Sequence, residues 1–407
     1  MRPIDVHRRE ALALVAPLPA IEVQLEETPG LVLARDVVAP ADLPRWDNSS
    51  MDGYAVRWAD VALASAQAPV SLAVLADLPA GSSARPVLGP GSAARIMTGA
   101  MLPVGADAVV PVEHTDAGLE RVLVSQAPEP GAYIRRAGGD VRAGTTILTA
   151  GTVLGPVHVA AAAAAGCDHL PVHRRPRVAV LSTGSELVEP GTELELGQIP
   201  DSNSFLLAAA VRECGGEAVR IGVVPDVAAS LRAVFDELDG TVDLVITSGG
   251  VSKGAYDVVK EVLEPEPGMS FVEVAMQPGK PQGIGRLAHG TPVFALPGNP
   301  VSVLVSFEVF VRAAVLRLCG RTDIDRHHYT GVVMDGWRNR TGRTQFMPIT
   351  FESEESAMQC RIRSAGPGGS ESHLVASLAR AEGLAVVEAG VEVVRSGDRL
   401  PVTRLDR

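Results

Sequence analysis

Cysteine is scarce in this chain of 407 residues, and the four that occur stand singly at 167, 214, 319 and 360. No two of them have the C-x-x-C spacing of a zinc site, and scattered cysteines do not form a disulfide framework. The nine histidines show neither H-x-x-H nor H-E-x-x-H spacing, which argues against a histidine-bound metal. A reduced, cytoplasmic setting is therefore expected.

Long apolar runs and an N-terminal targeting signal are also missing. No stretch of about 18 apolar residues lacks a charge, and the alanine-rich segment 157–166 is too short to cross a bilayer. The N-terminus carries an early acid, Asp5, and no apolar core before a small-residue cleavage site. The sequence therefore predicts neither a membrane span nor a secretory signal.

Lysine is rare as well, because only Lys253, Lys260 and Lys280 are lysines among 36 basic residues. With 48 acids the formal net charge is −12, which repels a phosphate backbone, so nucleic acid is not an expected partner. Genome composition is the simplest reason for the arginine bias. Lys253 and Lys280 nevertheless stand in glycine-containing loops, where a compact ammonium can meet phosphate.

What the sequence does contain is a change of rhythm along the chain. Residues 5–19 have the apolar spacing of one amphipathic helix that stops at proline. Short alternating segments from about 20 to 150 predict small β-structures joined by turns. From 176 to 320 short aliphatic strands alternate with amphipathic helices, which predicts a parallel sheet covered on both faces. Short strands return over 328–407 and predict a C-terminal β-domain. At this length, two to four domains are expected.

In the α/β part, we expect five strands and four helices. The strands are predicted at 177–184, 218–224, 243–250, 271–276 and 291–298, and the helices at 202–214, 226–238, 255–264 and 299–320.

Three of these strands end in small polar residues. Ligands of open α/β sheets bind at the carboxyl ends of the strands, where loops and helix N-termini present backbone N–H groups. None of the three ends fits the P-loop or G-x-G-x-x-G pattern, and each by itself could be an ordinary turn and helix cap. Together they predict an anion site unlike that of a P-loop enzyme. The residues are Thr183, Gly184 and Glu186; Ser248, Gly249 and Gly250; and Pro297, Gly298, Asn299, Pro300 and Ser302.

Eight collinear stretches resemble the MoeA family of molybdopterin molybdenumtransferases, whose fold also occurs in a domain of gephyrin. The stretches are DNSSMDGYAV (47–56), RIMTGAMLPVGADAVV (95–110), YIRRAGGDVRAG (133–144), STGSEL (182–187), DSN (201–203), SGGVSKGAYD (248–257), PGKP (278–281) and PGNPVS (297–302).

The resemblance implies an elongated homodimer of multi-domain α/β plus β subunits. Each subunit would have a molybdopterin-binding α/β domain, an inserted β-rich domain, a linker region and a C-terminal β-barrel. The corresponding divisions are an N-terminal helix that packs on the α/β domain (1–19), the linker (20–45 and 141–170), the inserted domain (46–140), the α/β domain (175–325) and the barrel (328–407).

The implied reaction inserts molybdate into adenylylated molybdopterin and releases AMP and molybdenum cofactor, with Mg²⁺ as the helping cation. A molybdopterin adenylyltransferase would make the substrate, and carriers on the molybdoenzyme side would take the product. The two sulfurs of the ligand take the molybdenum, so no protein nucleophile is required.

By motif match, the family's functional acids fall on Asp52, Asp140, Glu186 and Asp257, and its threonine falls on Thr98. Carboxylates beside a pyrophosphate repel it unless a cation lies between them, and Mg²⁺ prefers oxygen ligands. Glu186 and Asp257 are therefore expected to hold the metal or orient phosphate, while Asp52 and Asp140 complete the cleft. The family favours completion across the dimer interface rather than within one subunit.

Ordinary structural roles stay open for several of these residues. Asp52 precedes a glycine as in a common hairpin turn, Asp140 could be a turn acid, and Asp257 could favour the start of a helix. Arg135 and Arg136 could bind molybdate or phosphate, or form a solvated pair.

Two departures from the family pattern stand out. Gly139 occupies a position where many members have glutamate, so any role of that acid is in doubt. Lys253 replaces a small residue and either adds an anion contact or points to solvent. Two other functions also stay open: a molybdopterin adenylyltransferase, although it needs only the α/β domain, and a non-catalytic scaffold.

Overall fold

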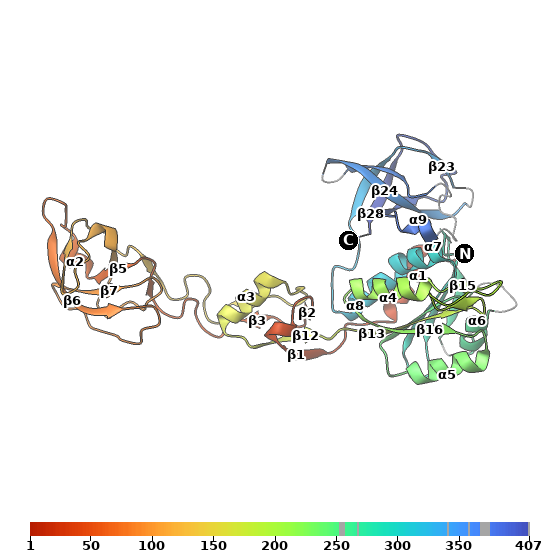
Figure 1. Ribbon diagram of the computed structural model, residues 1–407, viewed down its shortest axis with the longest axis horizontal. Helices are drawn as coiled ribbons and strands as arrows, with labels where there is room; N and C mark the ends of the chain where they lie inside the picture. Colours follow the sequence, from red (N-terminus) through yellow and green to blue (C-terminus); the bar gives the residue numbers. More distant parts are fainter. Residues whose placement is uncertain (252–256, 267, 340–341, 357–358, 367–374, 406–407) are drawn as a thin grey trace.

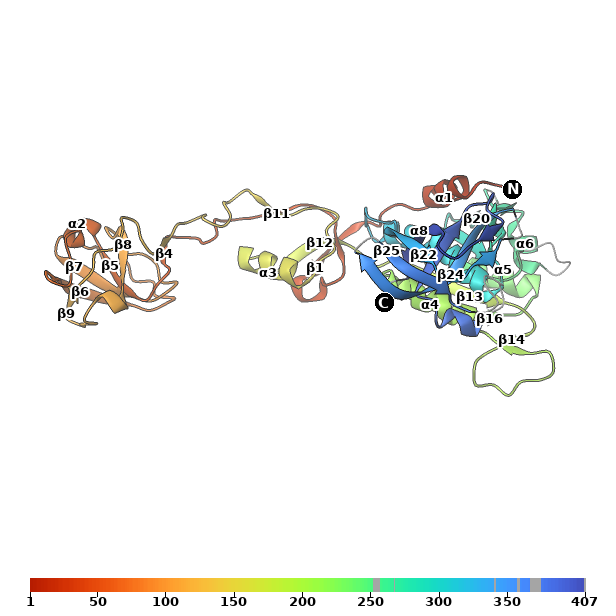
Figure 2. The same cartoon turned by 90° about the horizontal axis from the view of Figure 1, so that it is seen from above.

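The chain is strongly elongated in the computed structural model, which describes residues 1–251, 257–266, 268–339, 342–356, 359–366 and 375–405. Figure 1 shows one body at the far end, a smaller one in the middle, and a larger one in which two units lie together. Figure 2 shows the same separation from above. Among the described residues, no helix has the length and apolar character needed to span a membrane.

The body at the far end is built on a five-stranded sheet with the order β8-β5-β7-β6-β9. Successive residues of its strand β5 face opposite sides, so Tyr54 and Val56 join one apolar core and Ala55 joins another. The elements are β5 (Gly53–Val56), α2 (Trp58–Val61), β6 (Val70–Leu78), β7 (Ser92–Ile96), β8 (Ala108–Pro111) and β9 (Arg121–Val124); β4 (Asn48–Ser49) pairs with β10 (Ile134–Arg135) where the chain enters and leaves.

The middle body is assembled from segments before and after that excursion. Its three-stranded sheet has the order β1-β12-β2, and Leu33, Leu154, Ala162 and Leu170 meet in its core. The far body is therefore inserted into the middle one. The elements are β1 (Ala20–Gln24), β2 (Val32–Leu33), β3 (Val37–Val38), β11 (Thr146–Leu148), α3 (Pro156–Ala165) and β12 (His169–His173).

The α/β unit contains a six-stranded sheet with the order β16-β13-β17-β21-β20-β18. The first four strands are parallel, as predicted, whereas β20 pairs antiparallel with both of its neighbours, β21 and the edge strand β18. No strand was expected at β20, whose glycines hide the alternation of a strand; a Cβ on Gly283 would come within 2.6 Å of the Phe271 ring. The strands are β13 (Arg177–Thr183), β16 (Glu217–Val224), β17 (Leu244–Ser248), β18 (Ser270–Glu273), β20 (Pro281–Arg286) and β21 (Pro292–Leu296).

Helices cover both faces of this sheet. Leu244 and Ile246 of β17 join the core under α1, α4, α7 and α8, while Val245 between them joins the core under α5 and α6. This two-sided burial explains why the strands read as continuous aliphatic runs. The helices are α1 (Ile4–Ala13), α4 (Asn203–Glu213), α5 (Ala228–Leu238), α6 (Val258–Leu263), α7 (Pro300–Ser306) and α8 (Arg312–Leu318), with a π-helical turn (Phe307–Val311) between the last two.

The first helix is shorter than its apolar pattern suggested. It ends at Ala13 instead of continuing to residue 19. Pro17 has no N–H to donate to the Ala13 carbonyl, so the α-helical ladder cannot continue past that point. Val15 is still buried, but it belongs to the extended segment that follows the helix.

The C-terminal unit is a small closed barrel. Its strands follow the order β24-β25-β22-β28-β26, and β24 also pairs with β26, so the sheet closes on itself. The elements are β22 (His328–Val333), β24 (Thr344–Ser356), β25 (Gln359–Ser364), α9 (Val375–Leu378), β26 (Gly383–Val387) and β28 (Arg399–Arg404), with a pair formed by β23 (Trp337–Arg338) and β27 (Val393–Val394). Strand β19 (Met276–Gln277) pairs with β24 and joins the barrel to the α/β unit. The predicted fold class is confirmed.

Candidate functional site

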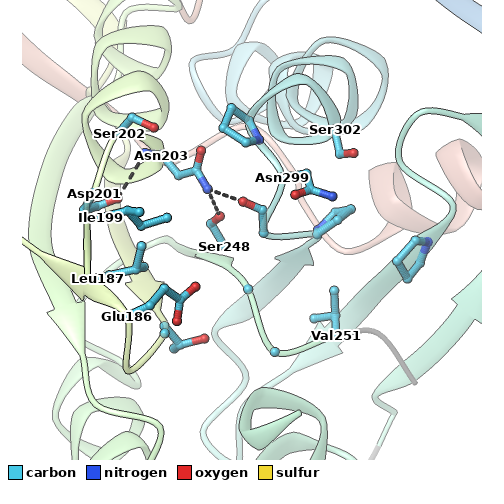
Figure 3. Close-up of a pocket in the computed structure, with 18 of the residues that line it drawn as sticks. Glu186, Leu187, Ile199, Asp201, Ser202, Asn203, Ser248, Val251, Asn299 and Ser302 are labelled. Atoms are coloured by element: carbon cyan, nitrogen blue, oxygen red, sulfur yellow. Dashed lines mark hydrogen bonds between the residues drawn. The ribbon is translucent and has the colours of Figure 1, made fainter. Parts of the chain in front are cut away.

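A pocket of about 890 Å³ lies at the carboxyl ends of β13, β17 and β21. All three strand ends singled out in the sequence line it, and Figure 3 labels Glu186, Ser248 and Asn299 among them. Asp257 and Lys280 line it too. The residues from the strand ends are Thr183, Gly184, Glu186, Ser248, Gly249, Gly250, Pro297, Gly298, Asn299, Pro300 and Ser302.

Glycine is required at the floor of this pocket because two backbone turns nearly touch. Gly249 has φ of +103°, and a Cβ there would lie 2.4 Å from the Thr183 carbonyl oxygen. A Cβ on Gly298 would lie 3.4 Å from the Gly249 Cα. The Gly249 N–H donates to the Leu296 carbonyl at 3.0 Å, which holds the two turns together, and only glycine fits at position 249.

Asp201 organises one wall of the pocket, although sequence reasoning gave it no role of its own. Its carboxylate is buried; Oδ1 accepts hydrogen bonds from Ser182 Oγ at 2.9 Å, from the Asn203 N–H at 3.0 Å and from the Ser204 N–H at 3.1 Å. It thereby joins the end of β13 to the first turn of α4. An acid just before an apolar helical run is a recognisable N-cap signal, which could have identified it.

Asn203, also missed, ties the other two strand ends to this wall. Its Nδ2 donates to Ser248 Oγ at 2.9 Å and to the Gly298 carbonyl at 2.6 Å, as the dashed lines in Figure 3 show. Its Oδ1 and Thr183 Oγ1 are buried without a hydrogen-bond partner among the described residues. Unpaired buried polar atoms are costly, so these two indicate where a bound ligand would add hydrogen bonds.

An arginine from the neighbouring strand holds the outer wall of the pocket. That wall includes Leu187 of β14 (Leu187–Val188) and both residues of β15 (Ile199–Pro200). Arg220 donates two hydrogen bonds, at 2.9 and 2.8 Å, to Glu189 in the loop between these strands. Arg220 also donates to Ser204 Oγ at 3.0 Å and stacks on Phe205, with 4.1 Å to the ring centroid. Ile221 is an extra residue in the pairing of β16 with β13, a bulge of the kind that re-aims neighbouring side chains.

The charge of the pocket is mostly negative. Glu186, Asp226 and Asp257 line it with the buried Asp201, and Figure 3 shows the Glu186 carboxylate directed into the cavity. Among the described lining residues, Lys280 is the one with a positively charged side chain. Its Nζ lies 3.1 Å from Glu273 Oε1. An anionic ligand would therefore need a cation between itself and these carboxylates.

The donor atoms present fit one kind of divalent cation. Among the described residues, no cluster of three histidine, cysteine or acidic side chains could hold a metal by itself. The pocket instead offers separate carboxylates and an unpartnered threonine hydroxyl, all of them oxygen donors. Such a set fits Mg²⁺, which takes one or two carboxylates and completes its shell with water and ligand phosphate.

Asp52 and Thr98, the predicted site residues of the far body, lie against each other. Asp52 Oδ1 accepts hydrogen bonds from the Thr98 N–H at 2.7 Å and from Thr98 Oγ1 at 2.8 Å. The backbone bond first, and the hydroxyl bond second, lower the pKa of Asp52 from its ordinary value. The carboxylate is therefore ionised and fixed in direction, although it is exposed.

Three more predicted residues lie near β10, where the chain leaves the far body. Arg136 donates to Asp47 at 2.6 Å, so its charge has a partner within the chain. Arg135 and Asp140 are exposed. Both views put this segment and the far body well away from the α/β sheet of the same subunit, so the two groups of predicted site residues do not meet within one chain (Figures 1 and 2). Lys253 lies outside the described residues.

Comparison with known proteins relates every part of the chain to one family. Residues 2–166 match a family described as "MoeA N-terminal region (domain I and II)", residues 179–317 match "Probable molybdopterin binding domain", and residues 330–405 match "MoeA C-terminal region (domain IV)". The molybdopterin molybdenumtransferase 2 of Mycobacterium tuberculosis is 46% identical over 408 residues and covers 99% of each chain.

Two further relatives extend the comparison. The molybdopterin molybdenumtransferase of Haemophilus influenzae is 35% identical over 93% of this chain and 92% of its own. The crystal structure of a molybdopterin biosynthesis MoeA protein from Pyrococcus horikosii superposes with a TM-score of 0.87 at 33% identity, over 100% of this chain and 99% of that one.

Proposed function

This chain belongs to the MoeA family, and we propose that it inserts molybdate into adenylylated molybdopterin, releasing AMP and molybdenum cofactor. The observation that carries the proposal is the meeting of three glycine-containing strand ends in one pocket large enough for a pterin and a pyrophosphate. The match over the N- and C-terminal regions favours this reaction over adenylyl transfer, for which the α/β domain alone would suffice.

The pocket supports a division of labour among its residues. Glu186 and Asp257 would hold Mg²⁺, which would neutralise the pyrophosphate and polarise the bond to AMP. Backbone N–H groups of the turns at Gly249 and Gly298 would orient phosphate, with Thr183 and Asn203 as further hydrogen-bonding groups. Lys280 would add a cation from the opposite rim. Catalysis on this basis rests on positioning and electrostatics, and no cysteine is found among the described lining residues.

The acids of the far body would complete the site from a second subunit. Asp52 is ionised and held by Thr98, and with Asp140 it lies too far along the elongated chain to serve its own pocket. A homodimer would also cover helix α3. All residues of this helix except His158 are apolar, and its Val157 is 73% exposed. Arg135 and Arg136 would then lie near the partner's pocket as anion contacts.

We also propose the wider setting that the family resemblance suggested. The domains would be a linker (20–45 with 141–170), an inserted domain (46–140), an α/β domain (175–325) with the N-terminal helix (1–19) packed on it, and a barrel (328–407). The enzyme would work in the cytoplasm, between a molybdopterin adenylyltransferase that supplies its substrate and carriers that take its product.

The deciding experiment measures AMP release from adenylylated molybdopterin by the purified protein. With Mg²⁺, molybdate is expected to trigger AMP release, and the product is expected to reconstitute a cofactor-free molybdoenzyme. Omitting molybdate or chelating Mg²⁺ should suppress both. Binding of the ligand without any cleavage would instead identify a scaffold, and formation of adenylylated molybdopterin from ATP would identify an adenylyltransferase.

A further inference from the structure

A second cavity, with no residue in common with the first, lies where the α/β unit joins the barrel. It has a volume of about 180 Å³ and is bounded by the first residue of α8, the segment that connects α8 to β22, the start of β22, and the last barrel strand, β28. Its lining residues are Arg312, Arg321, Asp323, Asp325, Arg326, His327, Tyr329 and Arg404. We refer to it as the junction cavity.

The arginines that line the junction cavity are more buried than its acids. All four of its arginines are partly buried, whereas Asp323 and Asp325 are exposed residues. Asp325 also pairs with Arg8 of the N-terminal helix. The desolvated charges are therefore the guanidinium groups, and they outnumber the carboxylates.

Two of the arginines have guanidinium N–H groups that donate to no carboxylate among the described residues. Arg312 donates one hydrogen bond, at 3.2 Å, to the Ile324 carbonyl. The Arg321 guanidinium makes no hydrogen bond or ion pair with any residue in the part of the chain that the structure describes. A partly buried guanidinium without a counter-ion is unfavourable, and a bound anion that accepts two parallel hydrogen bonds would relieve this cost.

The ion pair of Arg326 shows how tightly the same region binds a carboxylate when one is present. Arg326 bonds Glu308 at 2.7 and 3.2 Å, and both side chains are nearly buried, at 11% and 10% exposure. Arg326 lines the cavity and Glu308 does not, so this pair fixes one of the lining guanidinium groups. Asp323 and Asp325 also line the cavity, but among the described residues no carboxylate bonds Arg312 or Arg321 in this manner.

We propose that the junction cavity binds a small tetrahedral oxyanion of the phosphate, sulfate or molybdate class, with Arg312 and Arg321 as its principal donors. The cavity holds the equivalent of about six water molecules, which suits such an ion with part of its hydration shell and excludes a nucleotide or a pterin. Guanidinium groups are matched to tetrahedral oxyanions by their planar fork of donors.

An anion bound in the junction cavity would stabilise the contact between the barrel and the α/β unit. Arg312 and Arg321 belong to the α/β side and Arg404 to β28, so a shared anion would lie between the two units. The barrel side also reaches the main pocket, because Val375 of α9 is among the residues that line it. Oxyanion binding is therefore expected to stabilise the junction, and this effect does not depend on the proposed reaction.

The test is calorimetric titration and thermal unfolding of the full-length protein with sodium phosphate, sulfate or molybdate, at an ionic strength held constant with sodium chloride. Saturable binding and a raised melting temperature are expected with at least one of the ions. Arg321→Ala should weaken that binding roughly 10-fold or more, the scale of losing a bidentate charged contact, and Arg321→Lys should retain part of it.

Two control variants show whether the ion binds in the junction cavity. Arg399→Ala removes an exposed arginine from β28, outside the cavity, and should leave binding unchanged. Lys280→Ala alters the main pocket and should also leave it unchanged. Phosphate and sulfate binding together with molybdate supports a general oxyanion site, and molybdate binding alone supports one selective for that ion. Equal affinity in the Arg321→Ala protein, loss of binding in the Lys280→Ala protein, or an equal effect of chloride would overturn the proposal.

Discussion

Single residues decide how charge is presented in this protein, and Asp52 is the clearest example. Two hydrogen bonds from Thr98 lower the pKa of Asp52 and fix the direction of its carboxylate. The carboxylate is exposed, so a partner subunit would have access to it in the proposed homodimer. A hairpin turn needs no such arrangement, since the turn would form equally well with an uncharged side chain.

Asp52→Asn is expected to lower cofactor formation by about 100-fold or more, the scale of losing one preorganised charged contact in a transition state. Asparagine keeps an oxygen that can accept the bonds from Thr98, so stability and binding of the pterin substrate should change little. Asp116→Asn is the matched control, because Asp116 accepts backbone N–H bonds in the same body and belongs to no family motif. Activity near that of the control would remove Asp52 from the site.

His7 sets a second expectation at the residue scale. Its ring is buried and meets Phe310 edge-on, at 4.7 Å between centroids, and burial first and the charge of Arg2 second lower the pKa of His7 to about 4. Since the unfolded chain binds this proton near pH 6.5, stability is full at neutral pH and falls as pH drops from about 6.5 toward 4.

The measurement for His7 is urea unfolding followed by far-UV circular dichroism. As the pH falls from about 7 to about 5, His7 is expected to lower the free energy of unfolding by about 2 kcal/mol. His7→Leu should remove that part of the pH dependence. Identical pH dependence in both proteins would contradict the buried, neutral state of His7.

At the scale of elements, the pocket depends on turns and clamps that hold separate strands together. The three strand ends are joined through Asn203 to Ser248 and Gly298, and through Asp201 to Ser182. Arg220 extends this network outward to the loop between β14 and β15. The shape of the pocket is thus set by long-range hydrogen bonds between elements rather than by any one loop.

Gly249→Ala is expected to raise the KM for the adenylylated substrate and to lower the melting temperature, because the new Cβ meets the Thr183 carbonyl oxygen. Gly240→Ala is the matched control. Gly240 also has positive φ, at +74°, but a Cβ added there would have no other atom within 4 Å, and the residue lies outside the pocket. Both variants carry the conformational cost of about 1–2 kcal/mol, so an equal effect of the two would mean that the close approach of the turns is unimportant.

Arg220→Ala should raise the same KM about 10-fold while changing kcat much less, since Arg220 positions the pocket wall through charged hydrogen bonds worth roughly 1.5–3 kcal/mol. Arg220→Lys should restore only part of the affinity, because lysine cannot form the paired bonds to Glu189. The control is Arg232→Ala, which breaks an ion pair with Glu266 on another side of the same unit. A lower melting temperature with an unchanged KM would reduce Arg220 to a stabilising role.

At the scale of the whole molecule, elongation separates residues that the family motifs group together. Glu186 and Asp257 line the pocket of the α/β unit. Asp52 belongs to the far body, and Asp140 lies in the segment by which the chain leaves that body. If both groups act in one reaction, they must come from different subunits. Symmetry would then give two equivalent composite sites per dimer.

Mixing two inactive variants tests this arrangement. When Glu186→Gln and Asp52→Asn subunits are refolded or coexpressed in equal amounts, half of the dimers should be mixed and each should contain one intact site. Activity is therefore expected to recover to about a quarter of the native value. Each variant alone is the control. No recovery in proven mixed dimers would mean that both acids serve the same subunit.

Much of the fold could be predicted, and the elements that were missed share a physical reason. The parallel strands and their helices were predicted because two-sided burial leaves aliphatic runs in the sequence. Strand β20 was missed because its glycines, which admit Phe271 and Met269, remove the side chains that mark a strand. The first helix was predicted too long because its apolar spacing continues past Ala13. Pro17 has no N–H for the Ala13 carbonyl, so the helix ends there despite the pattern.

The sequence by itself determined the element types, the three strand ends and the family, since these depend on local spacing and on motifs in order along the chain. Only the tertiary structure decided that those ends share one pocket with Asp201 and Asn203, that Asp52 is oriented by Thr98, and that the two groups of acids lie apart in a subunit. Such relations join residues far apart in the chain, and burial and direction in space leave no periodic trace in it.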